Sequence, residues 1–74
     1  MIKITVKAFS FLEKFITETT LTLPEGVSCE DVLRRLNIPK KDVFVCIVNG
    51  SNVPFNTKLK DNDSLSLLPH LEGG

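Results

Sequence analysis

The segment VSCEDVLRRL, residues 27–36, carries the clearest helical pattern in the 74-residue sequence. Four apolar residues recur at the i, i+3, i+4, i+7 spacing that places them on one helix face: Cys29, Val32, Leu33 and Leu36. Ser28 is a favourable N-cap residue, and Asp31 three positions later completes a shortened capping box. A single apolar stripe can cover only one face of a sheet. The segment therefore predicts one main helix packed on one side of the fold.

Strand patterns lie on both sides of this helix in the sequence. The predicted strands are residues 2–8, 19–23, 43–48, 51–54 and 64–68. Residues 9–16 break the alternation and predict a short helical turn or compact loop, and Asn49-Gly50 predicts a tight turn. A crossover through the helix should return the last strand parallel to the first. We therefore predict an α+β fold with a mixed sheet of about five strands and one open sheet face.

The chain is expected to form one domain, residues 1–68, followed by a flexible C-terminal Gly-Gly tail, residues 69–74. Pro69 should end the last strand because it lacks a backbone donor. Six extended residues span at most about 20 Å, so a terminal carboxylate could enter the active site of another protein. Glycine has no Cβ and fits a narrow channel. A frayed terminus is the alternative interpretation of the same residues.

Composition argues against several functional classes. Nine basic and nine acidic residues give a net charge of zero, which disfavours nucleic-acid binding. No apolar run approaches the roughly 18 residues of a membrane span, and the N-terminus lacks a signal-peptide pattern, so we expect a cytoplasmic protein. Two cysteines and one histidine match no metal pattern. Because the sequence lacks a phosphate loop and a catalytic His–Cys pair, we expect neither an enzyme nor a bound cofactor.

Some apolar residues break the strand alternation and are candidates for a partner-binding surface. They are Phe44, Cys46 and Leu68, which we expect on the open sheet face. In the alternative interpretation, Phe44 and Cys46 belong to the core and the other parity of their strand is exposed. Cys29 is expected to be a packed structural thiol, although the first turn of a helix can also lower a thiol pKa.

Two motifs resemble the MoaD/ThiS sulfur carriers, which are ubiquitin-like β-grasp proteins. One is the Asp61-Asn62-Asp63 turn before the last strand, where the family usually has glycine in the middle position; the other is Gly73-Gly74. Together with the order of the elements, the resemblance covers nearly the whole chain. It implies a β-grasp fold and a carrier whose C-terminal glycine is adenylated and converted to a thiocarboxylate.

The resemblance also assigns roles to the tail and to partners. Gly74 would carry the sulfur, while Gly73, Glu72, Leu71 and Pro69 would thread into the partner. The implied partners are a ubiquitin-activating-like adenylyltransferase that uses ATP, a sulfurtransferase, and the large subunit of molybdopterin synthase or thiazole synthase. The segment 9–16 and Pro69 favour the molybdopterin branch, and the thiamine branch remains the alternative. A ubiquitin-like binding module or protein modifier is a further alternative.

Overall fold

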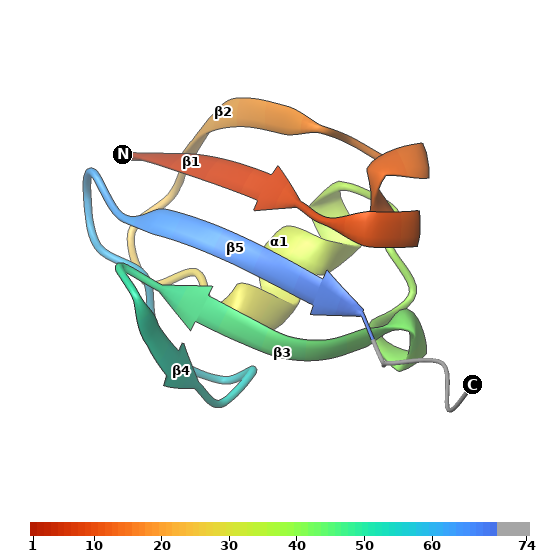
Figure 1. Ribbon diagram of the computed structural model, residues 1–74. Helices are drawn as coiled ribbons and strands as arrows, with labels where there is room; N and C mark the ends of the chain where they lie inside the picture. Colours follow the sequence, from red (N-terminus) through yellow and green to blue (C-terminus); the bar gives the residue numbers. More distant parts are fainter. Residues whose placement is uncertain (70–74) are drawn as a thin grey trace.

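Five strands form one mixed sheet in the order β2-β1-β5-β3-β4, in a computed structural model that describes residues 1–69 (Figure 1). The strands are β1 (Ile2–Ala8), β2 (Glu18–Leu23), β3 (Val43–Val48), β4 (Ser51–Val53) and β5 (Ser64–Pro69). β1 runs parallel to β5 and antiparallel to β2, and β3 runs antiparallel to both β5 and β4. The predicted mixed sheet and the parallel pairing of the first and last strands are confirmed.

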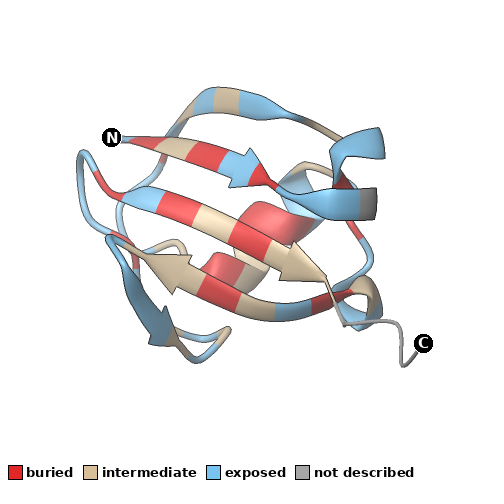
Figure 2. Cartoon of the chain, in the orientation of Figure 1, coloured by how far each residue is buried: buried red, intermediate tan, exposed pale blue. Residues whose placement is uncertain are grey.

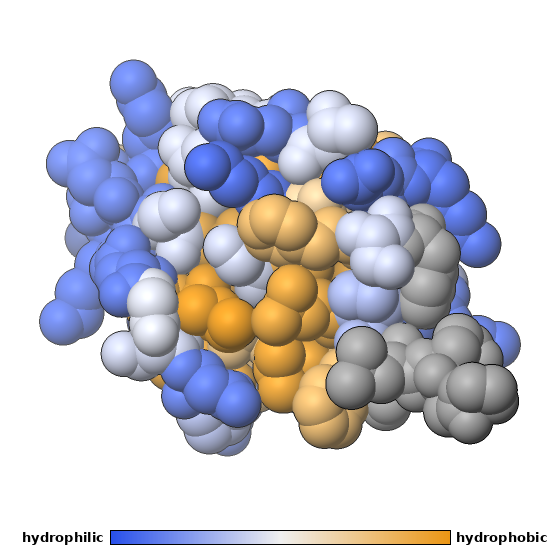
Figure 3. Space-filling model, viewed as in Figure 1, coloured by the Kyte–Doolittle hydropathy of each residue, from blue (hydrophilic) through white to orange (hydrophobic). Residues whose placement is uncertain are grey.

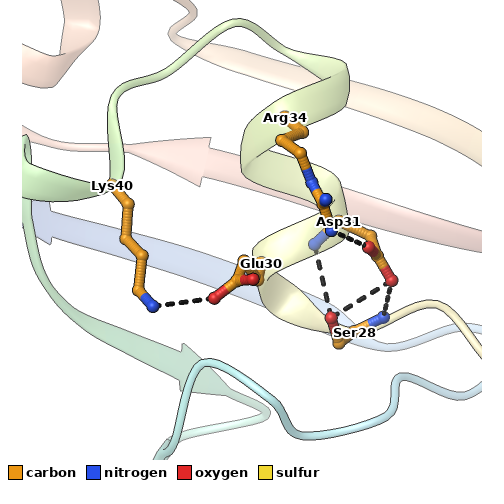
Figure 4. Close-up of polar contacts among 5 residues, drawn as sticks. All are labelled: Ser28, Glu30, Asp31, Arg34 and Lys40. Atoms are coloured by element: carbon orange, nitrogen blue, oxygen red, sulfur yellow. Dashed lines mark hydrogen bonds and ion pairs between the residues drawn. The ribbon is translucent and has the colours of Figure 1, made fainter.

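The helix α1 (Cys29–Arg35) lies against one face of the sheet, behind it in the view of Figure 1. Its start is a capping box, in which the Asp31 N–H donates to Ser28 Oγ at 3.3 Å and the Ser28 N–H donates to the Asp31 carboxylate at 2.9 Å (Figure 4). Hydrogen bonds from Ser28 hold the pKa of Asp31 below its usual value. The stabilising effect of this carboxylate is therefore complete at neutral pH and is lost as the pH falls through the lowered pKa.

The end of α1 is fixed by a left-handed residue that the sequence pattern did not reveal. Asn37 has φ of 59°, and the Ile38 N–H donates to the Leu33 carbonyl at 2.9 Å. The Asn37 N–H also donates to the Arg34 carbonyl at 3.2 Å, which completes a Schellman motif. Both Leu33 and Ile38 are buried, so the motif brings the next segment into the core.

Replacing Ser28 with alanine is expected to lower the free energy of unfolding by about 1 kcal/mol, because it removes the acceptor for the Asp31 N–H. Urea denaturation followed by circular dichroism measures the loss. Ser64→Ala is the matched control: Ser64 is exposed, and its N–H and carbonyl make the hydrogen bonds with Asn49. Equal denaturation midpoints for the two variants would contradict the capping role.

The core lies between α1 and the sheet. Figure 2 shows buried residues alternating along β1 and β5 and covering the facing side of α1. Within residues 1–69 the buried apolar residues are Ile2, Ile4, Val6, Ala8, Leu12, Leu23, Cys29, Val32, Leu33, Ile38, Val43, Cys46, Leu59, Leu65 and Leu67. Leu21 and Leu36, which we also predicted to pack here, are half-buried against this cluster. The predicted helix stripe and its sheet partners are thus confirmed.

The connections follow the predicted turns with two differences. The segment after β1 forms a 3-10 helix, η1 (Ser10–Lys14), as expected, whereas the 3-10 helix η2 (Lys40–Asp42) was not predicted. Pro69 is the last residue of β5 and pairs with Val43, so the strand extends one residue beyond the predicted boundary. A proline is tolerated at this strand end because little of the ladder follows it. The rest of the predicted tail, residues 70–74, lies outside the described residues.

Candidate functional site

The sheet face opposite α1 carries an apolar patch formed by Phe44, Val45, Ile47 and Leu68. The strand register places Val45 beside Leu68 and Ile47 beside Ser66 on this face. Figure 3 looks directly at the face and shows apolar atoms gathered over β3 and β5 in its centre. Phe44 is 56% exposed, and the other three residues are half-buried. Exposed apolar surface of this kind usually marks an interaction site.

A β-bulge in β3 decides which residues reach this face. The register shifts between Val43 and Val45, so that Val43 pairs with Pro69 while Val45 pairs with Leu68. The extra residue turns Phe44 outward next to Val45 and changes the parity of the strand beyond it. As a result Phe44 and Cys46 lie on opposite faces although they are two residues apart.

The expectation that Cys46 lies on the open face is wrong. Its side chain has no exposed surface and points into the core, where it is flanked by its partners Leu67 and Val53. The alternative interpretation, which placed both Phe44 and Cys46 in the core, fails for Phe44. Phe44 and Leu68 do lie on the open face, and a role in partner binding stays a prediction for both.

Val45 and Ile47 are patch residues that sequence reasoning missed. β3 is apolar at every position, so its sequence has no alternation that could reveal which side chains face outward. The usable signal was in β5, where Leu65 and Leu67 point inward and Leu68 outward. It would have required the register between β3 and β5, which the sequence does not provide.

Polar residues border the patch on the β1 side. The outward positions of β1 and β2 carry Lys3, Thr5, Lys7, Thr20 and Thr22, according to the register of the two strands. Phe9 follows β1 in extended conformation, is 41% exposed, and donates its N–H to the Leu67 carbonyl at 3.2 Å. It therefore adds a second exposed aromatic ring near the Leu68 end of β5. The apolar part of the face lies at the end of the sheet where β5 leads toward residue 70.

The turn before β5, singled out in the sequence, anchors the other end of that strand. The nearly buried Asp63 carboxylate accepts from Asn49 Nδ2 at 2.8 Å and from the Lys60 N–H at 2.7 Å. The Ser64 N–H donates to Asn49 Oδ1 at 2.9 Å. Asn62 has φ of 69°, as expected for a residue at a position where the family has glycine. The motif thus holds the β3–β4 turn and the start of β5 together.

Both thiols of the chain are buried. Hydrogen bonding with Cys46 lowers the pKa of Cys29, whereas the same contact and burial raise the pKa of Cys46. The cause of the lowered value is therefore the second thiol, with the backbone N–H of Cys29 contributing less. The interpretation of Cys29 as a packed core thiol agrees with its complete burial.

Other predicted site features are limited to what residues 1–69 show. Pro69 sits at the end of β5, while Leu71, Glu72, Gly73 and Gly74 lie outside the described residues. The described part of the chain contains no cluster of three or more His, Cys, Asp or Glu side chains that could hold a metal ion. Within the same range, none of the helices has the length and apolar character that crossing a membrane requires.

Solved structures with this fold include two bacterial or archaeal molybdopterin proteins and an archaeal modifier. The putative molybdopterin converting factor subunit 1 from Pyrococcus furiosus matches with a TM-score of 0.76 and 24% identity over 96% of this chain and 100% of that one. The small archaeal modifier protein 1 of Haloferax volcanii matches with a TM-score of 0.80 and 16% identity, again over 96% and 100%. These similarities establish the ubiquitin-like β-grasp fold.

A third structure contains two subunits. It is the complex of subunits 1 and 2 of the molybdopterin-converting factor from Helicobacter pylori 26695, with a TM-score of 0.69 and 24% identity over 99% of this chain and 100% of that one. No match was found among curated protein sequences. The sequence model of the ThiS family matches residues 6–74, which is nearly the full length. The chain therefore belongs to the ThiS family.

Proposed function

We propose that this protein is a sulfur carrier whose C-terminal glycine, Gly74, is adenylated and then converted to a thiocarboxylate. The observation that carries the proposal is the family match, which runs through Gly73-Gly74 to residue 74. A carboxylate is a poor acyl donor because oxide is a poor leaving group. Adenylation by ATP supplies a phosphate leaving group, and sulfur then replaces AMP. The product keeps its sulfur attached to the carrier until an acceptor takes it.

The carrier itself supplies no catalytic group in this scheme. A ubiquitin-activating-like adenylyltransferase performs the activation and a sulfurtransferase provides the sulfur. The absence of a metal-binding cluster among residues 1–69 is compatible with such a carrier. The proposed acceptor is the molybdopterin pathway, through the large subunit of molybdopterin synthase. The η1 segment after β1 and Pro69 at the end of β5 favour this branch over thiazole synthase in the thiamine pathway.

The apolar patch is the proposed docking surface for these partners. It lies on the open sheet face and reaches Leu68, the residue before Pro69. A partner that covers the patch would therefore also hold the point from which the tail leaves the domain. Such an arrangement fixes the distance from the docked domain to the reaction centre, because at most about 3.5 Å of reach is added per extended residue.

Mass spectrometry of the protein isolated from its host tests the proposed chemistry. A population heavier than the carboxylate form by about 16 Da is expected, since one oxygen is exchanged for sulfur in a covalent modification. Incubation with the activating enzyme, ATP and a sulfur donor should increase this population, and omission of ATP should abolish it. A mass that never changes under these conditions would contradict the proposal and favour a ubiquitin-like binding module.

A further inference from the structure

The two cysteines come from different elements and meet in the core. Cys29 is the first residue of α1, and Cys46 lies on the helix-facing side of β3. Both side chains have 0% exposed surface and belong to the same apolar cluster. Each thiol is the other's hydrogen-bond partner. No other cysteine occurs in the sequence, so any internal disulfide must join these two residues.

We propose that Cys29 and Cys46 form a reversible disulfide bond inside the native core when the protein meets a small disulfide oxidant such as glutathione disulfide. One glutathione disulfide and the two thiols give one protein disulfide and two glutathione thiols. The two sulfurs lose two electrons and two protons, and the glutathione disulfide accepts both. The inference concerns only the folded domain and does not depend on the sulfur-carrier function.

The environment of the two thiols sets the order of the exchange. Hydrogen bonding from Cys46 favours the thiolate of Cys29, which makes Cys29 the first nucleophile. Attack on glutathione disulfide gives a mixed disulfide at Cys29 and releases one glutathione. Cys46 then attacks the Cys29 sulfur and releases the second glutathione. The short distance implied by the thiol–thiol hydrogen bond favours this second, intramolecular step.

Access to the buried thiols requires a local opening at the start of α1. The Cys29 N–H donates to the Thr57 carbonyl at 3.2 Å, and the Glu30 N–H donates to the Phe55 carbonyl at 2.9 Å. These bonds hold the segment between β4 and β5 over the first turn of the helix. Because the segment is largely exposed, it can open without disruption of the sheet. Oxidation should therefore be slow but should yield a folded product.

The disulfide would join α1 directly to the strand that carries the apolar patch. Cys46 lies between Val45 and Ile47, whose side chains point to the opposite face. Closing a loop of roughly 18 residues restricts the unfolded chain and stabilises the native state. The oxidised protein should consequently be more stable than the reduced one, with β3 held more firmly against α1.

Equilibration with glutathione buffers of graded redox ratio tests the inference. The native protein and the protein in concentrated urea are acid-quenched, alkylated and weighed to measure the fraction with the internal disulfide. We expect half-oxidation of the native protein at a ratio at least about 10-fold more reducing than in urea. The oxidised protein should keep its circular dichroism spectrum and melt at least about 5 °C higher, and dithiothreitol should reverse both changes.

Two outcomes would overturn the inference. In one, the unfolded chain forms the disulfide but the native protein does not; in the other, the oxidised protein loses its fold or melts at a lower temperature. Cys46→Ala and Cys46→Val are control variants of smaller and larger volume, so that at least one should keep the core packed. Neither can form the internal bond, and a rise in melting temperature with glutathione disulfide in either variant would also contradict the proposal.

Discussion

Deletion of Gly74 is expected to reduce sulfur transfer at least about 100-fold while leaving the stability of the domain unchanged. The proposed reaction takes place at the carboxylate of residue 74, and removal of one residue withdraws it by about 3.5 Å. Misplacement of a reacting group by about 1 Å can already cost 100-fold in rate. Addition of one glycine after Gly74 should have the same effect, because it moves the carboxylate past the reaction centre by the same distance.

The assay contains the activating enzyme, ATP and a sulfur donor, and measures formation of the thiocarboxylate by mass. Gly73→Val and Gly73→Ala form a graded pair of controls, since both keep the length of the chain. The branched Cβ of valine should block a narrow channel, whereas alanine should retain part of the activity. Full activity from the Gly74 deletion would end the sulfur-carrier hypothesis. The binding-module alternative expects all four variants to behave like wild type.

The sequence predicted the helix, the strand order and the main core because local patterns and tertiary packing agree there. Ser28 and Asp31 specify the start of α1 through their own side chains, and Asn49-Gly50 specifies the hairpin through its left-handed φ values of 52° and 89°. The parallel pairing of β1 with β5 followed from the single crossover that the helix requires. In each case a few neighbouring residues contain the necessary information.

The open face was predicted less completely because it depends on the register between distant strands. The bulge at Phe44 and Val45 exists only as a mismatch between β3 and β5, and no residue type in β3 announces it. A shift of one residue reverses the faces of all following side chains, which is why Cys46 was misplaced and Ile47 was missed. The family match covers the tail through residue 74, but the functional roles of residues 70–74 stay predictions.

Replacement of Phe44 with aspartate is expected to weaken binding of the activating enzyme at least about 30-fold, the equivalent of losing about 2 kcal/mol at an aromatic hot spot. Phe44 is the most exposed residue of the apolar patch, so a partner that covers the patch must desolvate whatever stands at this position. A buried carboxylate without a partner charge is strongly unfavourable. Titration calorimetry or surface plasmon resonance with the purified enzyme measures the change in Kd.

Thr20→Asp is the matched control for this variant. Thr20 is exposed on the same sheet face, but it belongs to β2, at the polar edge of the sheet and away from the patch. It introduces the same charge into a strand, so a general electrostatic effect on the enzyme should appear in both variants. A specific docking role requires that Thr20→Asp bind within about 3-fold of wild type, a difference of less than 1 kcal/mol. Urea denaturation must show both variants folded, since a surface substitution should cost less than about 1 kcal/mol even in a strand. If Phe44→Asp unfolds, its ring stabilises the domain; if it stays folded and binds like wild type, the partners dock elsewhere on the protein.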